Sequence, residues 1–275
     1  VIDACGYAGT EGCGYEEALE KLKVVMARGC SREDNSVNII GFRSDEPHWR
    51  GDLREIVRLL ASQGIKVNSI VSWCSVDELS MAPRAALNVV LGGDGLNLAK
   101  RMAEEFGTPY VVVPYPFGRL NTIEFLEKVC EGLGRGVNYG EIEHEEEALK
   151  EAIADCHIYI EGIYGSLRAC LVGESSRVFS MARFLREELN IGVELAVIRS
   201  RSPLTEEEAA KAPFKVMVEP DRFDFERTLS ELEVDMLFAS SYERGLAIRL
   251  GIPLFRFSYP TVDAVCLTDV PYAGF

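Results

Sequence analysis

A recurring unit constrains the fold of this chain more than any other feature: a helical pattern ends at a glycine and leads directly into an apolar run. The unit occurs four times, at residues 54–71, 97–114, 181–198 and 242–257. Glycine often ends a helix in the left-handed conformation, and the glycines at this point are Gly64, Gly107, Gly192 and Gly251. The apolar runs are continuous, as in parallel strands that are covered on both faces. The chain is therefore predicted to have an α/β fold, with parallel sheets flanked by helices and right-handed crossovers.

One stretch differs from its surroundings and divides the chain. Residues 131–148 are rich in glycine and then in glutamate, which indicates a linker that runs into a long helix from about 142 to 162. We predict one Rossmann-like domain at 33–140 and a second at 141–275, reached through this helix. Residues 1–32 are expected to be the remnant of a preceding domain, because the chain begins directly in a short apolar run. The predicted strands lie near 37–41, 66–71, 87–91, 110–113, 167–172, 193–198, 215–218, 235–239 and 253–257.

Net charge and cysteine spacing indicate which classes of partner and which cellular compartment to expect for this chain. With 29 basic and 44 acidic residues, the formal net charge is −15, and partners such as nucleic acid or an anionic membrane are not expected without a dense basic face. No apolar run reaches the roughly 20 residues of a membrane helix.

The eight cysteines form no C-x-x-C pair, which argues against a zinc ribbon or a thioredoxin motif. Several fall within strand or helix patterns, so we predict reduced thiols in a cytoplasmic protein.

Candidate site residues lie in the loops after the predicted strands, because ligands of open parallel sheets bind beyond the carboxyl ends of the strands. We expect a cleft between two facing sheets, lined by His48, Trp73, Cys74, Gly92, Gly93, Ser240, Ser241, Tyr242, Ser258 and Tyr259. Structural alternatives exist for several of them. The serines of ASSYER can cap a helix, and Trp73 can serve packing. The glycines of LGGDGLN can form either a tight turn or a cradle of amides for an anion.

Two cysteines near the start, Cys5 and Cys13, sit among four glycines. Two thiolates do not complete an iron–sulfur cluster, which usually takes four, so further ligands would have to come from outside this segment. The stretch is either part of a metal site or a glycine-rich turn.

Of the three histidines, His144 and His157 belong to the acidic helix, and a histidine-rich metal cage is not expected.

Several ordered segments resemble the nitrogenase component 1 oxidoreductases. This family includes the α and β subunits of nitrogenase, their cofactor-assembly scaffold, the protochlorophyllide and chlorophyllide reductases and the nickel-sirohydrochlorin reductive cyclase. The segments are VNIIGF (37–42), GDLREIVRLLASQGI (51–65), APRAALNVVL (82–91), GTPYVVVPYPFGRLNTIEFL (107–126) and LGIPLFRFSYPTVDAV (250–265). The resemblance covers essentially the whole chain and rests on the order and spacing of these motifs together.

The resemblance implies a fold of three Rossmann-like domains around a metallocentre, of which this chain holds the second and third. Family members bind their bridging or electron-relay cluster through cysteines of the first domain. An iron–sulfur cluster is therefore expected in the intact protein, with its ligands mainly outside this segment. The opening stretch then matches the wall of the cluster bay, with Cys5 as its candidate metal ligand. The implied partners are a homologous component 1 subunit and an ATP-dependent iron–sulfur reductase.

Departures from the family pattern narrow this interpretation. The nitrogenase α subunit has a cofactor-ligating cysteine where this sequence has Gly92, and a cofactor-ligating histidine near the position of Ser258. Its active-site glutamine and histidine have no counterpart in TEGCGYEE. The chain is therefore closer to a β-type or nitrogenase-like subunit, and dinitrogen reduction is not expected of it.

Three functions remain open. The first is a subunit of a two-component oxidoreductase, in which electrons from the reductase reach a metallocluster site and the metal carries the chemistry. The second is a cofactor-assembly scaffold that binds a cluster or a tetrapyrrole without turnover. The third is a small-molecule or metal-chelate binding module built from two facing sheets.

Overall fold

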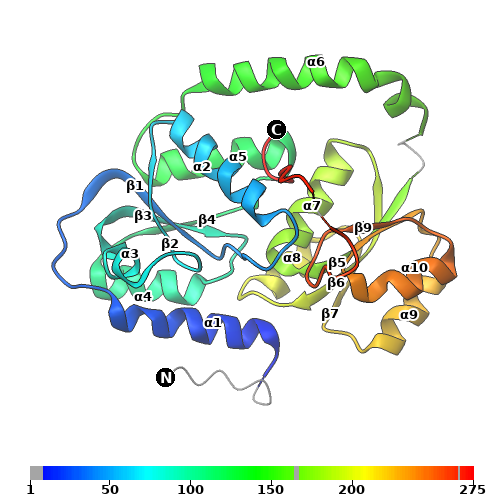
Figure 1. Ribbon diagram of the computed structural model, residues 1–275, viewed down its shortest axis with the longest axis horizontal. Helices are drawn as coiled ribbons and strands as arrows, with labels where there is room; N and C mark the ends of the chain where they lie inside the picture. The colour runs from blue at the N-terminus through cyan, green and yellow to red at the C-terminus, as the bar shows by residue number, and fades with distance from the viewer. Residues whose placement is uncertain (1–8, 164–166, 266) are drawn as a thin grey trace.

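The computed structural model describes residues 9–163, 167–265 and 267–275. Two parallel sheets lie side by side, each flanked by helices (Figure 1). The first sheet has the order β2-β1-β3-β4, formed by β1 (Glu33–Ile40), β2 (Lys66–Ile70), β3 (Ala85–Leu91) and β4 (Tyr110–Val113). The second has the order β7-β6-β5-β8-β9, formed by β5 (Arg168–Glu174), β6 (Gly192–Ser200), β7 (Lys215–Val218), β8 (Met236–Ala239) and β9 (Leu254–Arg256).

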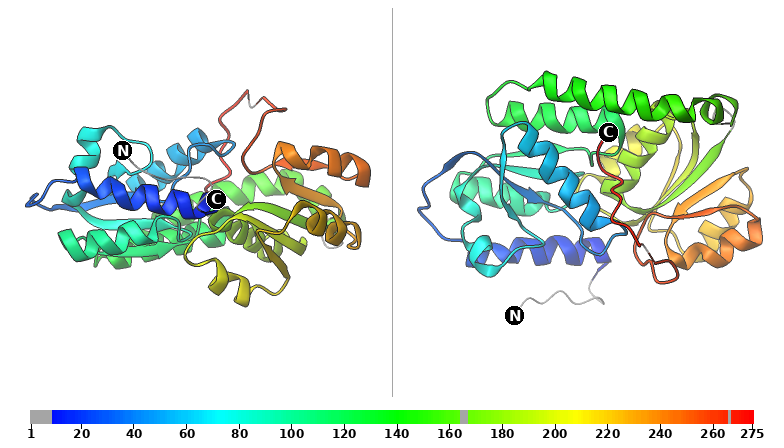
Figure 2. Two further views of the ribbon diagram at one scale, coloured as in Figure 1. Left: turned by 90° about the horizontal axis from the view of Figure 1, so that it is seen from below. Right: turned by 45° about the horizontal axis from the view of Figure 1, so that its top comes forward.

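Helices flank each sheet, and we call a sheet with its helices a lobe. The first lobe contains α1 (Glu11–Leu22), α2 (Trp49–Ser62), α3 (Val76–Ser80), α4 (Leu96–Phe106) and α5 (Gly118–Gly132), with short 3₁₀ turns at Lys23–Val25 and Ala82–Arg84. The second contains α7 (Ser175–Glu187), α8 (Thr205–Lys211), α9 (Arg222–Ser230) and α10 (Arg244–Leu250), with a 3₁₀ turn at Ser241–Glu243 that we call η4. Helix α6 (Tyr139–Ile163) connects the two lobes and runs along one side of the molecule (Figure 2).

One apolar core crosses the boundary between the lobes. Alternate residues of β3 show how it is built: Leu87, Val89 and Leu91 join a cluster that also contains residues of α2, α5 and α7. Val90 points to the opposite layer, between α1 and α4. A third cluster lies between the second sheet and helices α9 and α10. Because the largest cluster takes side chains from both sheets, the two lobes fold against each other as one body.

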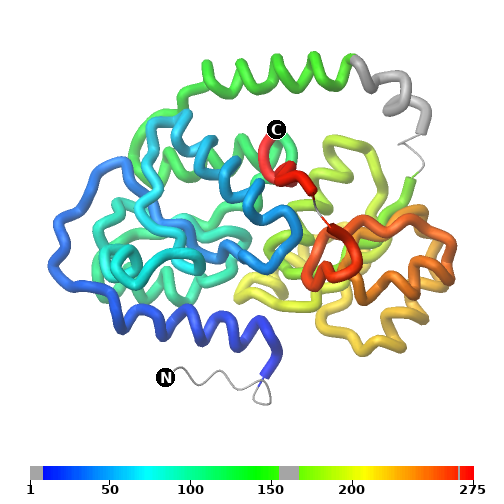
Figure 3. The backbone as a smooth tube through the Cα atoms, viewed as in Figure 1, coloured from blue at the N-terminus to red at the C-terminus, as the bar shows by residue number. Residues whose placement is uncertain are grey.

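The last residues of the chain return from the second lobe to the first (Figure 3). The backbone N–H groups of Tyr272 and Ala273 donate to Asp52 Oδ1 of α2, over 2.6 and 3.0 Å. The N–H of Gly274 donates to the carbonyl of Pro116 over 2.7 Å. The backbone N–H groups of this segment therefore tie the end of the chain to the first lobe.

The structure confirms the predicted fold class, with two parallel sheets flanked by helices. Each predicted strand overlaps an observed one, and the linker helix is α6. Gly64, Gly107 and Gly251 end their helices with φ of 69°, 71° and 69°. Gly192 does not end a helix, because it is the first residue of β6. The residue with a positive φ after α7 is Asn190, and asparagine tolerates this left-handed conformation. The domain boundaries at 32/33 and 140/141 remain predictions.

No helix among these described residues is both long and apolar enough to cross a bilayer.

Candidate functional site

A cavity of about 620 Å³ lies at the carboxyl ends of β5, β6, β8 and β9, and we call it the edge cavity. This is the end of a parallel sheet at which ligands bind, and the volume falls within the range of small-molecule sites. Four predicted residues line it, namely Ser240, Tyr242, Ser258 and Tyr259. Residues that the sequence prediction did not single out also line it, among them Glu11, Glu174, Arg199, Arg222, Phe225 and Glu243.

Both signs of charge line the edge cavity. Arg199 Nη2 lies 3.2 Å from Glu243 Oε1, and its guanidinium carbon lies 5.2 Å from the centre of the Phe225 ring. Arg222 pairs with Glu226 over 2.7 Å. The guanidinium groups are therefore held by carboxylates within the wall, and an incoming anion would have to compete with those carboxylates.

The two serines of the cavity have structural bonds. Ser240 Oγ accepts from the N–H of Tyr242 over 3.1 Å and donates to Glu243 Oε2 over 2.6 Å. The backbone N–H of Ser240 also donates to Glu243 Oε2 over 3.1 Å, which completes a capping box for η4. Ser258 is buried and donates to the carbonyl of Val172 over 2.8 Å. Helix capping, the structural alternative for the ASSYER serines, is therefore observed at Ser240. The neighbouring Ser241 donates to Asp263.

A buried charge network lies behind the edge cavity, where the lobes meet. Arg43, which follows β1, lies 3.4 Å from Asp94 Oδ2 and donates to Ser200 Oγ over 2.9 Å. Asp94, which follows β3, accepts from Ser176 of α7 over 2.8 Å. Burial and the nearby anion Glu174 raise the pKa of Asp94, while Arg43 opposes the shift. Polar side chains from both lobes are therefore desolvated together at this junction.

Arg177 forms the second half of the network. Its guanidinium is fully buried, 3.2 Å from Asp52 Oδ2 and 3.8 Å from Glu46 Oε2. The rings of Tyr115, Phe117 and Phe257 surround it at 5.0 to 5.1 Å. None of these charged residues was among the predicted site residues. Arg177 lies in the first turn of α7, Asp52 in the first turn of α2, and Glu46 in the loop after β1.

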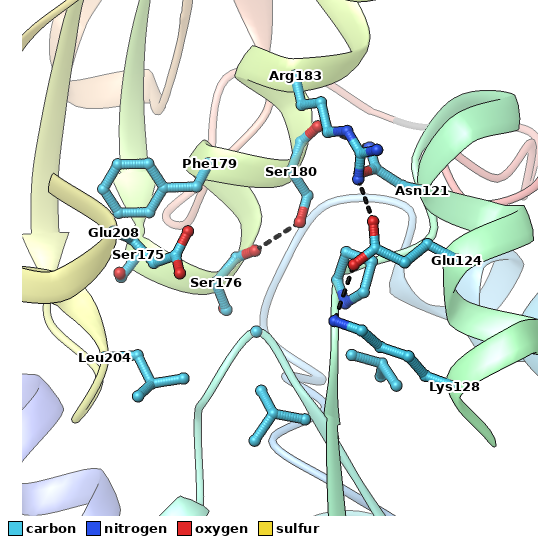
Figure 4. Close-up of a pocket in the computed structure, with 14 residues that line it drawn as sticks. Asn121, Glu124, Lys128, Ser175, Ser176, Phe179, Ser180, Arg183, Leu204 and Glu208 are labelled. Carbon is cyan, nitrogen blue, oxygen red and sulfur yellow. Dashed lines mark hydrogen bonds and ion pairs between the residues drawn. The ribbon is translucent and has the colours of Figure 1, made fainter. Parts of the chain in front are cut away.

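Gly92 and Gly93 lie on the seam between the lobes. A Cβ on Gly92 would lie 2.5 Å from Ser176 Cα, and one on Gly93 would lie 2.9 Å from Leu204 Cδ1. Gly92 also lines a cavity of about 190 Å³ between α5 and α7, whose polar residues include Asn121, Ser176, Ser180 and Arg183 (Figure 4). In that cavity Glu124 of α5 pairs with both Arg183 and Lys128.

His48, Trp73 and Cys74 lie away from the edge cavity. His48 lines a separate cavity of about 300 Å³, which we call the outer cavity. Tyr259 lines both cavities. The Trp73 ring packs edge-on against Trp49 at 4.7 Å, and the Cys74 thiol lies 3.4 Å from Ser69 Oγ. The packing alternative for Trp73 is thus observed.

The amides of the glycine loop bind a carboxylate from the protein itself. The N–H groups of Gly95 and Asn97, at the start of α4, donate to the two oxygens of Glu16 on α1. Burial raises the pKa of Glu16 to about 7, although these hydrogen bonds lower it. Glu16 therefore occupies the amides that the sequence analysis considered for an external anion.

The described residues do not fit an iron–sulfur cluster. Free thiols among them are Cys13, Cys30, Cys74, Cys130 and Cys170. Within the described part of the chain, no group of three or more His, Cys, Asp and Glu side chains is arranged to hold a metal ion. The walls of the edge cavity carry carboxylates, guanidinium groups and hydroxyls rather than thiolates, whereas clusters are held by cysteine. Cys5 lies outside the described residues.

Comparison with known proteins gives consistent matches. The family model of nitrogenase component 1 type oxidoreductases matches residues 1–275. A light-independent protochlorophyllide reductase subunit of Chaetosphaeridium globosum is 29% identical over 259 residues, 87% of this chain and 49% of that protein. The nitrogenase iron–molybdenum cofactor biosynthesis protein NifE of Clostridium pasteurianum is 27% identical over 261 residues, 91% of this chain and 55% of that protein.

The fold agrees with these matches. The solved structure of nitrogenase Cp1 at pH 6.5 superposes with a TM-score of 0.80 and 22% identity, over 98% of this chain and 62% of that one. The chain spans about half the length of the curated relatives it matches. With a family model matched along its whole length, the chain belongs to the nitrogenase component 1 type oxidoreductase family.

Proposed function

We propose that this chain forms the two sheet-bearing lobes of a subunit of a nitrogenase-like two-component oxidoreductase. The observation that carries the proposal is the family match over residues 1–275. The partners proposed are a homologous component 1 subunit and an ATP-dependent iron–sulfur reductase that supplies electrons, in the cytoplasm. Because the chain spans about half of its relatives, the activity belongs to the intact protein.

Within that protein, the edge cavity is the proposed substrate or cofactor bay. Its charged walls would orient a bound group, and Arg199 would face the group's negative charge, with Phe225 at its back. The metallocluster is proposed to have its ligands outside the described residues, with Cys5 as the candidate contact from this chain. When bound in the intact protein, the cluster would supply electron transfer.

The test is anaerobic purification of the full-length protein, followed by iron analysis and EPR spectroscopy. We expect a coloured, iron-containing protein that associates with a second subunit and shows a cluster signal after reduction. A colourless, iron-free monomer would overturn the proposal and would favour the binding module instead.

The second candidate is a cofactor-assembly scaffold, and the similarity to NifE, a cofactor biosynthesis protein, favours it. A scaffold binds a cluster or tetrapyrrole without turning it over. Addition of the reductase, ATP and an electron donor to the iron-containing protein separates the two functions. Catalytic turnover supports the oxidoreductase, whereas loss of the bound cluster to an acceptor protein without turnover supports the scaffold.

A further inference from the structure

Two buried carboxyl groups meet where the lobes join. Glu46 lies in the loop between β1 and α2, and Glu174 is the last residue of β5; the two residues are 1% and 3% exposed. The two carboxyl groups are within hydrogen-bonding reach of each other. Glu46 Oε1 and Glu174 Oε2 are each buried with no other hydrogen-bond donor. A proton shared by the two groups would satisfy both atoms.

Neighbouring charges allow one negative charge on the pair but oppose two. Burial and the facing carboxyl of Glu174 raise the pKa of Glu46 well above its usual range. The cations facing the pair are Arg177, 3.8 Å from Glu46 Oε2, and Arg43, which lies near Glu174. Both already have other acidic partners, since Arg177 pairs with Asp52 and Arg43 with Asp94 and Glu11.

Two more anions lie close to the pair. Asp45 is next to Glu46, and Asp94 is next to Glu174. One further donor, the N–H of Tyr259, reaches Glu46 Oε2 over 3.1 Å. Two carboxylates in contact in such a site retain one proton at neutral pH, because like charges disfavour each other when desolvated.

The pair lies between two cavities. Glu174 lines the edge cavity and Glu46 lines the outer cavity. Asp45 and His48 line the outer cavity as well, and Asp45 is exposed to solvent. The carboxyl pair therefore contacts the candidate site on one side and an opening that carries titratable groups on the other.

We propose that Glu174 and Glu46 form a proton relay into the edge cavity, an inference that rests on the proposed reductive function. Glu46, which holds the shared proton, passes it to Glu174, and the new O–H bond on Glu174 breaks when a basic atom of the bound ligand takes the proton. A hydronium ion in the outer cavity then protonates Glu46 and becomes water. One proton moves from solvent to ligand in each cycle, and both carboxyl groups return to their starting state. Glu174 is the donor, and Glu46 is a positioning residue that acts through it.

Infrared spectroscopy of the full-length protein tests the shared proton directly. The E16Q background is used, because Glu16 is a second buried carboxyl with a pKa of about 7. We expect the carbonyl stretch of a protonated carboxylic acid to persist at neutral pH, and to lose the same component in both E46Q and E174Q. The control is E207Q, which changes an exposed acid of α8 that pairs with Lys211 and should leave the band in place. Absence of the band in the parent protein overturns the inference, whether or not either variant folds.

Turnover in the reductase assay tests the transfer. We expect E174Q to lower kcat by about 100-fold or more with KM within about twofold, as for loss of a general acid, and E174D to restore part of the rate. E46Q should lower kcat and remove its pH dependence above neutrality, and E207Q should leave kcat unchanged. Unchanged kcat in E174Q overturns the relay. A parent protein that lacks the cluster signal contradicts the proposed function instead, and the infrared band still decides whether the proton is shared.

Discussion

Arg177 of α7 and Asp52 of α2 form a fully buried ion pair across the boundary between the lobes, with Nη1 3.2 Å from Oδ2. Asp52 also accepts the backbone N–H groups of Tyr272 and Ala273. A single carboxylate therefore joins the first lobe, the second lobe and the C-terminal segment. Because both members of the pair are removed from water, their charges depend on one another for solvation.

Removing the Arg177 guanidinium should strongly destabilise the folded protein. We expect R177M to lower the free energy of unfolding by about 3–5 kcal/mol, because Asp52 and Glu46 would be left buried without their cation. Urea unfolding of the full chain measures this. The control is R227M, which removes an exposed arginine of α9 that pairs with Asp224 and should change the stability by less than about 1 kcal/mol. Equal effects of the two variants would contradict the buried role of Arg177.

Gly92 should tolerate no side chain, because the two lobes touch at this residue. In G92A the new Cβ would lie 2.4 Å from the Cβ of Ser176, so the backbone at one of these two residues must shift. Gly134 offers a matched control: its φ of 68° is similar to the 56° of Gly92, and nothing lies within 4 Å of a Cβ placed there.

G134A should therefore cost only the backbone strain of about 1–2 kcal/mol. G92A should cost that strain plus about 1–3 kcal/mol of overpacking. Chemical denaturation of both variants measures the difference. If G92A is no less stable than G134A, the seam is looser than the structure shows.

Glu16 should make the protein less stable as the pH rises. Its pKa is raised from 4.5 to about 7 by burial in the folded protein, so the folded state binds more protons than the unfolded state between these values. The stability contributed by the neutral carboxyl is complete below about pH 4.5 and is lost as the pH rises through about 7.

E16Q should flatten this part of the stability curve, measured as urea midpoints from pH 5 to pH 8. E17Q is the control, since Glu17 is an exposed neighbour on α1 that pairs with Lys21. An identical pH slope in the parent protein and E16Q would show that Glu16 is ionised in the folded state throughout.

The described cysteines should differ sharply in their reactivity. Cys13 is exposed, whereas Cys130 and Cys170 are buried and burial raises the pKa of both thiols. Because the thiolate is the reactive form, we expect iodoacetamide to modify Cys13 rapidly and the two buried cysteines only after unfolding. Peptide mass spectrometry after increasing times of iodoacetamide treatment measures the extent of modification at each cysteine. Modification of Cys170 at the rate of Cys13 would contradict its place in the core.

The positions of the strands could be predicted because the signals are local. A continuous apolar run such as residues 169–172 is buried on both faces, and a glycine such as Gly107 ends the helix before β4. Part of the edge cavity could be predicted for a similar reason. Ser240, Ser258 and Tyr259 all follow strands of one parallel sheet, and the carboxyl ends of those strands must share an edge.

The charge network could not be predicted in this way. Arg177 and Asp52 are separated by 125 residues, and nothing near either one indicates that it is buried. In isolation each is an ordinary surface charge after a strand or at the start of a helix. His48 shows the opposite case: it follows a strand as predicted, yet the packing of the lobes places it in the outer cavity.

The amino-acid sequence by itself therefore determined the order and type of the elements, since these depend on periodicity and helix ends that neighbouring residues specify. Only the tertiary structure decided that Glu46 and Glu174 meet, that Glu16 occupies the amides of α4, and that Gly92 closes the seam. These relationships depend on how two separately formed sheets pack, and desolvation acts on a charge only after that packing has removed it from water.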